Sequence, residues 1–345
     1  MQPLRIAVMG AGLIGQRHIA HVRAEPHVQL SAVIDPAPAA REVAARAGVP
    51  LYPRFAAVPA AERPDGVVVA TPNQLHVEHA LELVAAGIPV LVEKPIADSL
   101  AGAQLLVEAA EAARVPLLVG HHRRHNPLIR KAREVIDAGR LGRLVLLSGH
   151  AWMMKPDDYF DVAWRRQPGA GPVLINLIHD VDLFRHLGGE IVDVQAQTSS
   201  AVRGHAVEDT ATVLLRFASG ALGTLSVSDT TVAPWSWETT SGENPAYPRE
   251  DEACCQIAGT QGALSVPQLD VWRYPGPRSW WEPLARERLA VAPEDPLRRQ
   301  IRHFAAVIRG SEAPLVSGRE GLATLRVVDA IGRAARQGGA IALAA

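Results

Sequence analysis

The chain has 345 residues, 48% of them hydrophobic, which exceeds what one hydrophobic core normally serves and predicts two domains. Its 35 basic and 36 acidic residues give a formal charge of −1, with no block of lysine or arginine that would follow a phosphate backbone. No apolar run reaches membrane-spanning length, and the first residues do not resemble a secretion signal. We therefore expect a cytoplasmic protein whose partners are small molecules rather than nucleic acid or membrane.

Apolar runs of strand length alternate with helical patterns over residues 1–122. The runs are RIAVMGAG, QLSAVID, GVVVATP, PVLVEKP and PLLVGHH, and helical patterns such as HVEHALELVAAG separate them. Such alternation predicts an α/β domain with a parallel sheet covered on both faces.

The pattern changes over residues 123–345. The segments RLVLLSGHAW, EIVDVQAQTSS, EDTATVLLRFASGALGTLSVSD and CCQIAGTQGALSV read as longer strands, with hairpin turns at ASGA and GTQGA. They predict a second domain built on an antiparallel sheet. Cys254 and Cys255 are adjacent, which suits neither a disulfide nor a zinc site and favours small core residues.

Three glycines follow the first predicted strand in the motif GAGLIG. Gly10 permits a tight turn, Gly12 lets the backbone approach a pyrophosphate, and Gly15 lets the helix pack on the strand. Asp35 ends the next strand, where it would accept hydrogen bonds from a ribose diol and repel a 2′-phosphate. The arrangement predicts a dinucleotide site that prefers NAD to NADP.

Polar residues also follow the third and fourth apolar runs. The carboxyl ends of parallel strands form the edge where ligands bind, so Thr71, Asn73 and His76 are expected near the cofactor and Lys94 near its nicotinamide. A lysine at a strand end is often only solvated, but the following Pro95 fixes the local backbone and could hold the ammonium rigidly.

Taken in order, GAGLIG, ATPN…H, EKP and the HDVD segment resemble the Gfo/Idh/MocA family of NAD(P)-dependent oxidoreductases over nearly the whole chain. The resemblance implies an N-terminal Rossmann domain with a doubly wound parallel sheet. It also implies a C-terminal α+β domain with a large open-faced antiparallel sheet, through which homodimers or homotetramers form. Its members act on sugars, cyclitols and related hydroxylated rings.

The resemblance also assigns residues. It implies that Lys94 lies beside the nicotinamide and the substrate. The expected cofactor residues are Gly10, Gly12, Leu13, Ile14, Gly15, Asp35, Thr71, Asn73, His76, Glu93, Lys94, Pro95, Trp164 and Arg165. The expected substrate residues are Lys94, Arg124, Asn126, Trp152, Asn176 and His179, and no metal site is expected.

The segment GPVLINLIHDVDLF, residues 171–184, reads as a helix with Asn176, His179 and Asp180 on one face. In the family the histidine of this segment acts as general base or acid, a role that imidazole suits near neutral pH. Many members carry an aspartate four residues earlier, where this chain has Ile175. Either Lys94 and His179 work alone, or another carboxylate such as Asp180 or Asp182 orients the imidazole.

The expected function is hydride transfer between NAD and a hydroxyl or carbonyl carbon of such a ring, with Lys94 and His179 catalytic. Two alternatives stay open: a lyase or hydrolase that oxidises a glycoside transiently with bound NAD, and a sensor that binds nicotinamide without chemistry. Trp152 could stack on a ring or be an ordinary core or interface aromatic, and Asp182 could pair with Arg185 or serve structure alone.

Overall fold

The computed structural model describes residues 2–343 and divides them into two compact units. The first unit comprises the chain up to His125 together with Glu294–Leu325. The second unit comprises Asn126–Pro293 and the chain from Arg326 onward. The expected boundary near residue 122 lies close to this one, but the return of a C-terminal segment to the first unit was not predicted. None of the described helices combines the length and apolar character needed to cross a bilayer.

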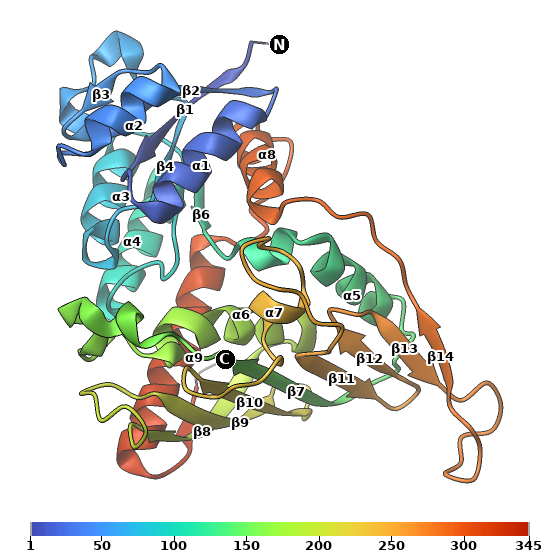
Figure 1. Cartoon of the computed structure of the whole chain (residues 1–345). Helices are drawn as coiled ribbons and strands as arrows, with labels where there is room; N and C mark the ends of the chain where they lie inside the picture. Colours follow the sequence, from blue (N-terminus) through green and yellow to red (C-terminus); the bar gives the residue numbers. More distant parts are fainter. Residues whose placement is uncertain (1, 344–345) are drawn as a thin grey trace. The chain divides into compact units, whose positions relative to one another are not determined.

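The first unit is built on a six-stranded, all-parallel sheet in the order β3-β2-β1-β4-β5-β6. Figure 1 shows α3 and α4 on one face of this sheet and α1 and α8 on the other. The parallel sheet predicted from the alternating runs is confirmed. Its elements are β1 (Leu4–Met9), α1 (Leu13–Ala24), β2 (Val28–Ile34), α2 (Ala40–Ala47), β3 (Leu51–Tyr52), η1 (Phe55–Ala57), η2 (Ala60–Glu62), β4 (Gly66–Val69), η3 (Asn73–Leu75), α3 (His76–Ala85), β5 (Val90–Val92), α4 (Leu100–Ala113), β6 (Leu117–Val119), η4 (His122–His125) and α8 (Pro296–Ile308).

Helix α8 explains why the C-terminal segment returns. Asp295 caps its start with hydrogen bonds from the amides of Leu297 and Arg298, and Pro296 takes the first helical position. Phe304 is fully buried and joins the apolar cluster formed by the central strands and α1. A β-carbon on Gly66 of β4 would lie 3.0 Å from this ring, so glycine lets α8 lie close to the strand.

The second unit is built on a nine-stranded sheet in the order β14-β13-β12-β11-β7-β10-β9-β8-β15. The sheet is mixed, because β10 pairs with β7 in parallel while the other neighbouring strands of the sheet pair antiparallel. The hairpins expected at ASGA and GTQGA are confirmed as β9–β10 and β11–β12. Its elements are α5 (Pro127–Asp137), β7 (Leu144–Trp152), η5 (Asp157–Asp161), η6 (Ala163–Arg166), the π-helix η7 (Val173–Leu177), α6 (Ile178–Gly188), β8 (Ile191–Ser199), β9 (Thr210–Phe217), β10 (Leu222–Ser228), α7 (Trp237–Thr240), β11 (Cys255–Gly259), β12 (Ala263–Val266), β13 (Asp270–Arg273), β14 (Ala285–Arg288) and β15 (Ile341–Ala342), and α9 (Gly318–Gln337) begins in the first unit and ends in the second.

One face of this sheet carries the core of the unit and the other faces outward. Strand β9 alternates buried and exposed residues along Thr210–Phe217, as a sheet covered on one side requires. Its inward side chains join one apolar cluster with α5 and α6, and Figure 1 shows both helices on the same side of the strands. Cys254 is buried in this cluster and Cys255 packs against it, as expected from the sequence.

Candidate functional site

The glycine loop between β1 and α1 meets different constraints at its three glycines. Gly10 has φ +97°, and a β-carbon there would lie 2.5 Å from the carbonyl oxygen of Ala70. A β-carbon on Gly15 would lie 2.0 Å from the carbonyl oxygen of Gly10. A β-carbon on Gly12 would meet no atom within 4 Å, so the backbone there is open to an incoming group. The first and third glycines serve the fold, and the second leaves room for a ligand.

The start of α1 has the features of an anion site. Gly12 is the N-cap and supplies no side-chain hydrogen bond, and the first turn holds no acidic residue. The first amides of the helix therefore keep their hydrogen atoms for an external acceptor, and the helix dipole favours negative charge there. Leu13 is 87% exposed in this turn and Ile14 is half-buried. The residues present fit the pyrophosphate of a dinucleotide.

Asp35 follows β2 and ties the glycine loop to the adjacent strand end. Its Oδ2 accepts a hydrogen bond from the amide of Ala11 at 2.7 Å, and its Oδ1 accepts one from the amide of Ala37 at 2.8 Å. Each carboxylate oxygen has two lone pairs, so both can still accept a ribose hydroxyl. The carboxylate thus has a structural role as well as the expected one.

His76, at the start of α3, joins two strand-end loops. The ring is fully buried, with Nδ1 at 2.8 Å from the carbonyl oxygen of Pro95 and Nε2 at 2.9 Å from that of Thr71. Burial is the main cause that lowers the pKa of His76, against the two carbonyl oxygens that raise it. The buried ring of His76 therefore connects the loop that carries Thr71 to the loop that carries Lys94. Asn73 begins the short helix η3.

Glu93 and Lys94 follow β5, with a cis peptide bond between Lys94 and Pro95. Oε1 of Glu93 lies 2.7 Å from Nε2 of the fully buried His18, and Oε2 accepts the amide hydrogen of Lys94 at 3.1 Å. Burial alone would raise the pKa of Glu93, but the hydrogen bond and charge of His18, with smaller contributions from His122 and Lys94, lower it from 4.5 to about 2. Glu93 is a buried anion that fixes the backbone from which Lys94 projects.

In the second unit the expected helix over residues 171–184 begins as the π-helix η7 and continues as α6. Asn176 lies in η7, whereas His179 and Asp180 lie in the first turn of α6 and are 8% and 9% exposed. Asp182 is almost fully buried, and Arg185 pairs with Glu190 at 2.6 Å. Single π-turns are rare and gather at functional sites, because they change the direction of the side chains that follow.

A buried charged cluster lies beyond the ends of β7 and β10. Lys155 is 6% exposed, and its Nζ lies 3.7 Å from Oδ2 of Asp229 and makes no hydrogen bond to any described residue. Arg203 donates from Nε to Oδ1 of Asp229 at 2.8 Å. Burial lowers the pKa of Lys155, and Asp229 opposes that shift. The Lys155 ammonium therefore has no hydrogen-bond acceptor among the described residues, and an oxygen atom of a ligand would supply one.

The same end of the unit carries two further carboxylates. Oε1 of Glu208 accepts a hydrogen bond from the amide of Val173 at the start of η7. The carboxylate occupies the space that a side chain at Gly171 would fill. Burial raises the pKa of Glu208. Asn176, Asp229 and Glu238 line a cavity of about 10 Å³, roughly the room of one water molecule. Oδ1 of Asn176 is buried without a hydrogen bond from any described residue, so this cavity suits a bound oxygen donor.

Other expected residues have different surroundings. Arg165 donates to the carbonyl oxygen of Tyr159 at 2.7 Å and stacks on its ring at 4.1 Å, while Trp164 is 55% exposed. In the first unit Arg124 forms an ion pair with Glu320 at 2.8 Å. These contacts orient the two arginines.

Asn126 and Trp152 also have partners of their own. Asn126 caps α5 and donates from Nδ2 to Glu243 at 2.8 Å. Trp152 donates from Nε1 to Ser226 at 2.8 Å on the outward side of the sheet, away from α6. The structure therefore does not bring Trp152 together with His179.

The expected site residues did not include Asp229, Glu208 or Arg203. Asp229 had a usable signal, because it is a charged residue directly after an apolar strand. Glu208 and Arg203 lie in the loop before β9, where charge is ordinary, and only the folded chain brings them to Asp229 and η7.

Residues 4–121 match the family described as "Oxidoreductase family, NAD-binding Rossmann fold", and residues 129–265 match "GFO/IDH/MocA C-terminal domain". The chain is 27% identical to the rhizopine catabolism protein MocA of Rhizobium meliloti, over 96% of this chain and 94% of the relative. It is 28% identical to inositol 2-dehydrogenase from strain 1021 of the same species, over 99% of both. The WlbA dehydrogenase from Bordetella pertussis, solved with NADH and UDP-GlcNAcA, is similar with a TM-score of 0.81 and 27% identity, covering 100% of both chains.

Proposed function

Because the chain belongs to the Gfo/Idh/MocA family of NAD-binding oxidoreductases, we propose that it transfers a hydride between NAD and a hydroxyl-bearing carbon of a sugar, cyclitol or related ring. The observation that carries the proposal is the glycine loop, in which only Gly12 is open to a ligand, at the uncapped start of α1 and bonded to Asp35. The names of the relatives, which include an inositol 2-dehydrogenase and a D-apiose dehydrogenase, support this class of substrate.

The preference for NAD is argued from Asp35. A carboxylate at the end of β2 accepts hydrogen bonds from a ribose diol and repels the 2′-phosphate of NADP. We propose that the cofactor residues named from the sequence, which begin with Gly10 and include Pro95, Trp164 and Arg165, bind this dinucleotide. When bound, the nicotinamide supplies the acceptor or donor of the hydride.

The proton is handled by the chain's own side chains. In the oxidative direction His179 takes the proton of the substrate hydroxyl, while the carbon that bears it gives up its hydrogen as hydride. Lys94 donates a hydrogen bond to the same oxygen and stabilises the charge that develops on it. Glu93 and His76 hold the backbone around Lys94 in place, since both are buried and bonded to that loop.

Position 175 carries isoleucine, so the carboxylate found there in many members must be replaced or dispensed with. Asp229 and Glu238 line the same small cavity as Asn176 and supply negative charge at this end of the second unit. Lys155 offers an ammonium for a substrate oxygen. We keep Asn176 and Lys155 as the substrate-facing residues of this unit and leave Trp152 out.

The test is NADH formation with NAD, and separately NADP, over cyclitols, aldoses, sugar acids and cyclic dihydrodiols. Lys94→Ala and His179→Ala should each lower kcat by about 10²–10⁴-fold. The matched controls, Lys131→Ala and His27→Ala, change a half-buried lysine of α5 and an exposed histidine, and should retain wild-type rates. NAD binding without net NADH formation on any compound would contradict the proposal and favour transient oxidation of a glycoside.

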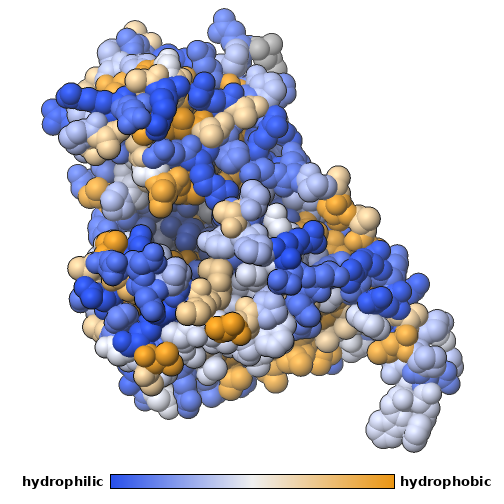
Figure 2. All heavy atoms as spheres, in the orientation of Figure 1, coloured by the Kyte–Doolittle hydropathy of each residue, from blue (hydrophilic) through white to orange (hydrophobic). Residues whose placement is uncertain are grey.

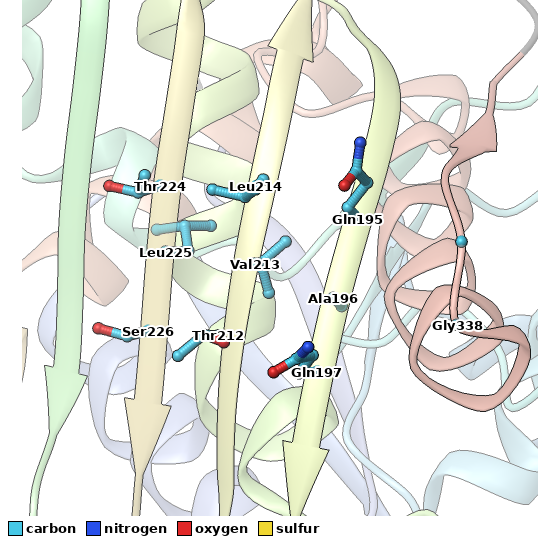
Figure 3. A pocket seen from close by; sticks show the side chains of 11 residues that line it. Gln195, Ala196, Gln197, Thr212, Val213, Leu214, Thr224, Leu225, Ser226 and Gly338 are labelled. Atoms are coloured by element: carbon cyan, nitrogen blue, oxygen red, sulfur yellow. The ribbon is translucent and has the colours of Figure 1, made fainter.

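We further propose that the protein forms homodimers or homotetramers through the outward face of the nine-stranded sheet. Leu146, Leu214 and Leu222 are 45%, 56% and 53% exposed on this face. Figure 2 shows apolar side chains along the lower margin of the second unit, below the strands drawn in Figure 1. The same face contains a hollow of about 470 Å³ over β8, β9 and β10, which Leu214 and Ala196 line (Figure 3). A sheet with one uncovered, partly apolar face favours stacking against another sheet.

A further inference from the structure

A fully buried histidine of α1 is tied to the loop that carries Lys94. His18 is 0% exposed, and its Nε2 lies 2.7 Å from Oε1 of Glu93. Oε2 of the same carboxylate accepts a hydrogen bond from the amide of Lys94 at 3.1 Å. The Glu93 carboxylate therefore connects α1 to the backbone of the proposed catalytic lysine, although His18 and Glu93 are 75 residues apart in the sequence.

The fold leaves a slot for this carboxylate just after β6. A β-carbon on Gly120 would lie 2.9 Å from Cδ of Glu93 and 3.0 Å from its Oε1. Any larger residue at position 120 would therefore push the carboxylate out of its place. With the slot at Gly120 on one side and the ring of His18 on another, the position of the carboxylate is fixed.

Stability alone explains this pair poorly. Nδ1 of His18 is buried and makes no hydrogen bond to any described residue. A buried nitrogen without a partner costs free energy, and a buried charged pair is often no more stable than well-packed apolar side chains of similar volume. Such an apolar replacement would lose one thing that the pair provides, which is the hydrogen bond to the amide of Lys94.

The pair joins two parts of the first unit that must keep a fixed separation during the proposed reaction. The start of α1 is the proposed pyrophosphate position, and the helix lies close to the glycine loop because a β-carbon on Gly15 would lie 2.0 Å from the carbonyl oxygen of Gly10. Lys94 follows β5, and in the same loop His76 lies 2.8 Å from the carbonyl oxygen of Pro95. A misplacement of ~1 Å between reacting groups can cost ~10²-fold in rate.

We propose that His18 is a positioning residue for hydride transfer, which acts through Glu93 to set the backbone of Lys94 relative to the dinucleotide bound at the start of α1. This inference rests on the proposed function, because it requires Lys94 to act on the substrate oxygen. It assigns a role in the reaction to a side chain that is buried away from solvent and acts only through its neighbour.

The charge of Glu93 provides a second readout. The groups whose charges interact with this carboxylate are His18 of α1, His122 of η4, His76 of α3 and Lys94 itself. A nearby anion favours the ammonium form of Lys94, in which the lysine donates a hydrogen bond to the substrate oxygen. Loss of that anion should therefore move the alkaline limb of the kcat profile to lower pH by about half a unit or more.

The test compares two substitutions of His18 with the ring compound that supports NADH formation. His18→Leu fills the space without a donor and should lower kcat by about 10- to 100-fold, with KM and the Kd for NAD within about threefold of wild type. It should also shift the alkaline limb. His18→Gln places an amide nitrogen at the same number of bonds from the backbone as Nε2, so it can still donate to Glu93 and should retain at least about a third of the wild-type kcat.

The matched control is Glu25→Gln, at the other end of α1. Glu25 is also a buried carboxylate, 2% exposed, and pairs with Arg302 of α8 at 3.1 Å. Its replacement removes a buried ion pair from the same helix without touching the Lys94 loop, so kcat and its pH profile should stay as in wild type. An equal loss of kcat in Glu25→Gln would overturn the inference, because disturbance of α1 would then be sufficient.

The remaining outcomes separate this inference from the proposed function. If His18→Leu does not fold, Glu93→Gln keeps an oxygen for the amide of Lys94, removes the charge, and should still shift the alkaline limb. Wild-type kcat with an unshifted limb in either variant, beside a large loss in Lys94→Ala, would overturn the inference and leave the proposed function intact. Wild-type activity in Lys94→Ala would overturn the proposed role of Lys94 and the inference with it.

Discussion

The buried pair His18–Glu93 gives a prediction whose size follows from the structure. The side chains of His18 and Glu93 are 0% and 8% exposed, and Nε2 of His18 lies 2.7 Å from Oε1 of Glu93. The lowering of the Glu93 pKa from 4.5 to about 2 corresponds to about 3 kcal/mol of stability. Replacing His18 by alanine leaves a buried carboxylate without its main partner, for which about 3–5 kcal/mol is expected.

The dependence on pH has a definite sign. A carboxylate with a lowered pKa in the folded chain contributes stability that is complete above about pH 4.5 and is lost as the pH falls toward 2. In His18→Ala, burial without the histidine raises the pKa of Glu93, so the folded variant takes up a proton more readily. The part of the stability loss that comes from the unpaired Glu93 carboxylate should therefore shrink as the pH is lowered, because the carboxyl of the variant becomes protonated.

The assay is urea unfolding of wild type, His18→Ala, Glu93→Gln and the double variant between pH 5 and 8. The double-mutant cycle should give a coupling of about 2 kcal/mol or more near pH 8. The exposed pair Glu42–Arg46, with side chains 77% and 61% exposed, is the matched control and should give less than about 0.5 kcal/mol. Equal small couplings in both cycles, unchanged with pH, would refute the argument that Glu93 is held as a buried anion.

Three further predictions concern the site. Gly15→Ala should disrupt the start of α1 and lower the melting temperature. Gly12→Ala should fold normally and lose at least tenfold in affinity for NAD, measured by titration. Wild-type affinity in Gly12→Ala would contradict the proposal that the pyrophosphate lies against Gly12. Lys155→Met should raise KM for the ring substrate with little change in KM for NAD, because it removes the incompletely paired ammonium and keeps the volume; equal effects on both would argue for a structural role. The lowered pKa of His76 makes its contribution to stability complete above about pH 6.5 and smaller as the pH falls, so His76→Asn should flatten the unfolding free energy between pH 7 and 5, and an unchanged slope would count against it.

Local sequence determined the elements whose signals are local. The parallel sheet of the first unit, the glycine loop and the two hairpins of the second follow from apolar periodicity and turn residues, which act over a few positions. The family could be recognised because GAGLIG, EKP and HDVD occur in order, and the matches over residues 4–121 and 129–265 confirm it. The helical reading of residues 171–184 was correct in outline, but the π-turn at its start has no local signature in the sequence.

Tertiary structure decided what depends on distant residues. The parallel pairing of β10 with β7, the return of α8 to the first unit and the meeting of Lys155, Arg203 and Asp229 join segments tens to hundreds of residues apart. Periodicity tells which face of a strand is buried, but not which helices or strands cover that face. The sequence by itself thus determined the elements and the cofactor loop, because backbone and neighbouring side chains fix them. Only the fold determined which charged side chains are buried and which are paired, because both depend on segments that are distant in the sequence and pack together within a unit.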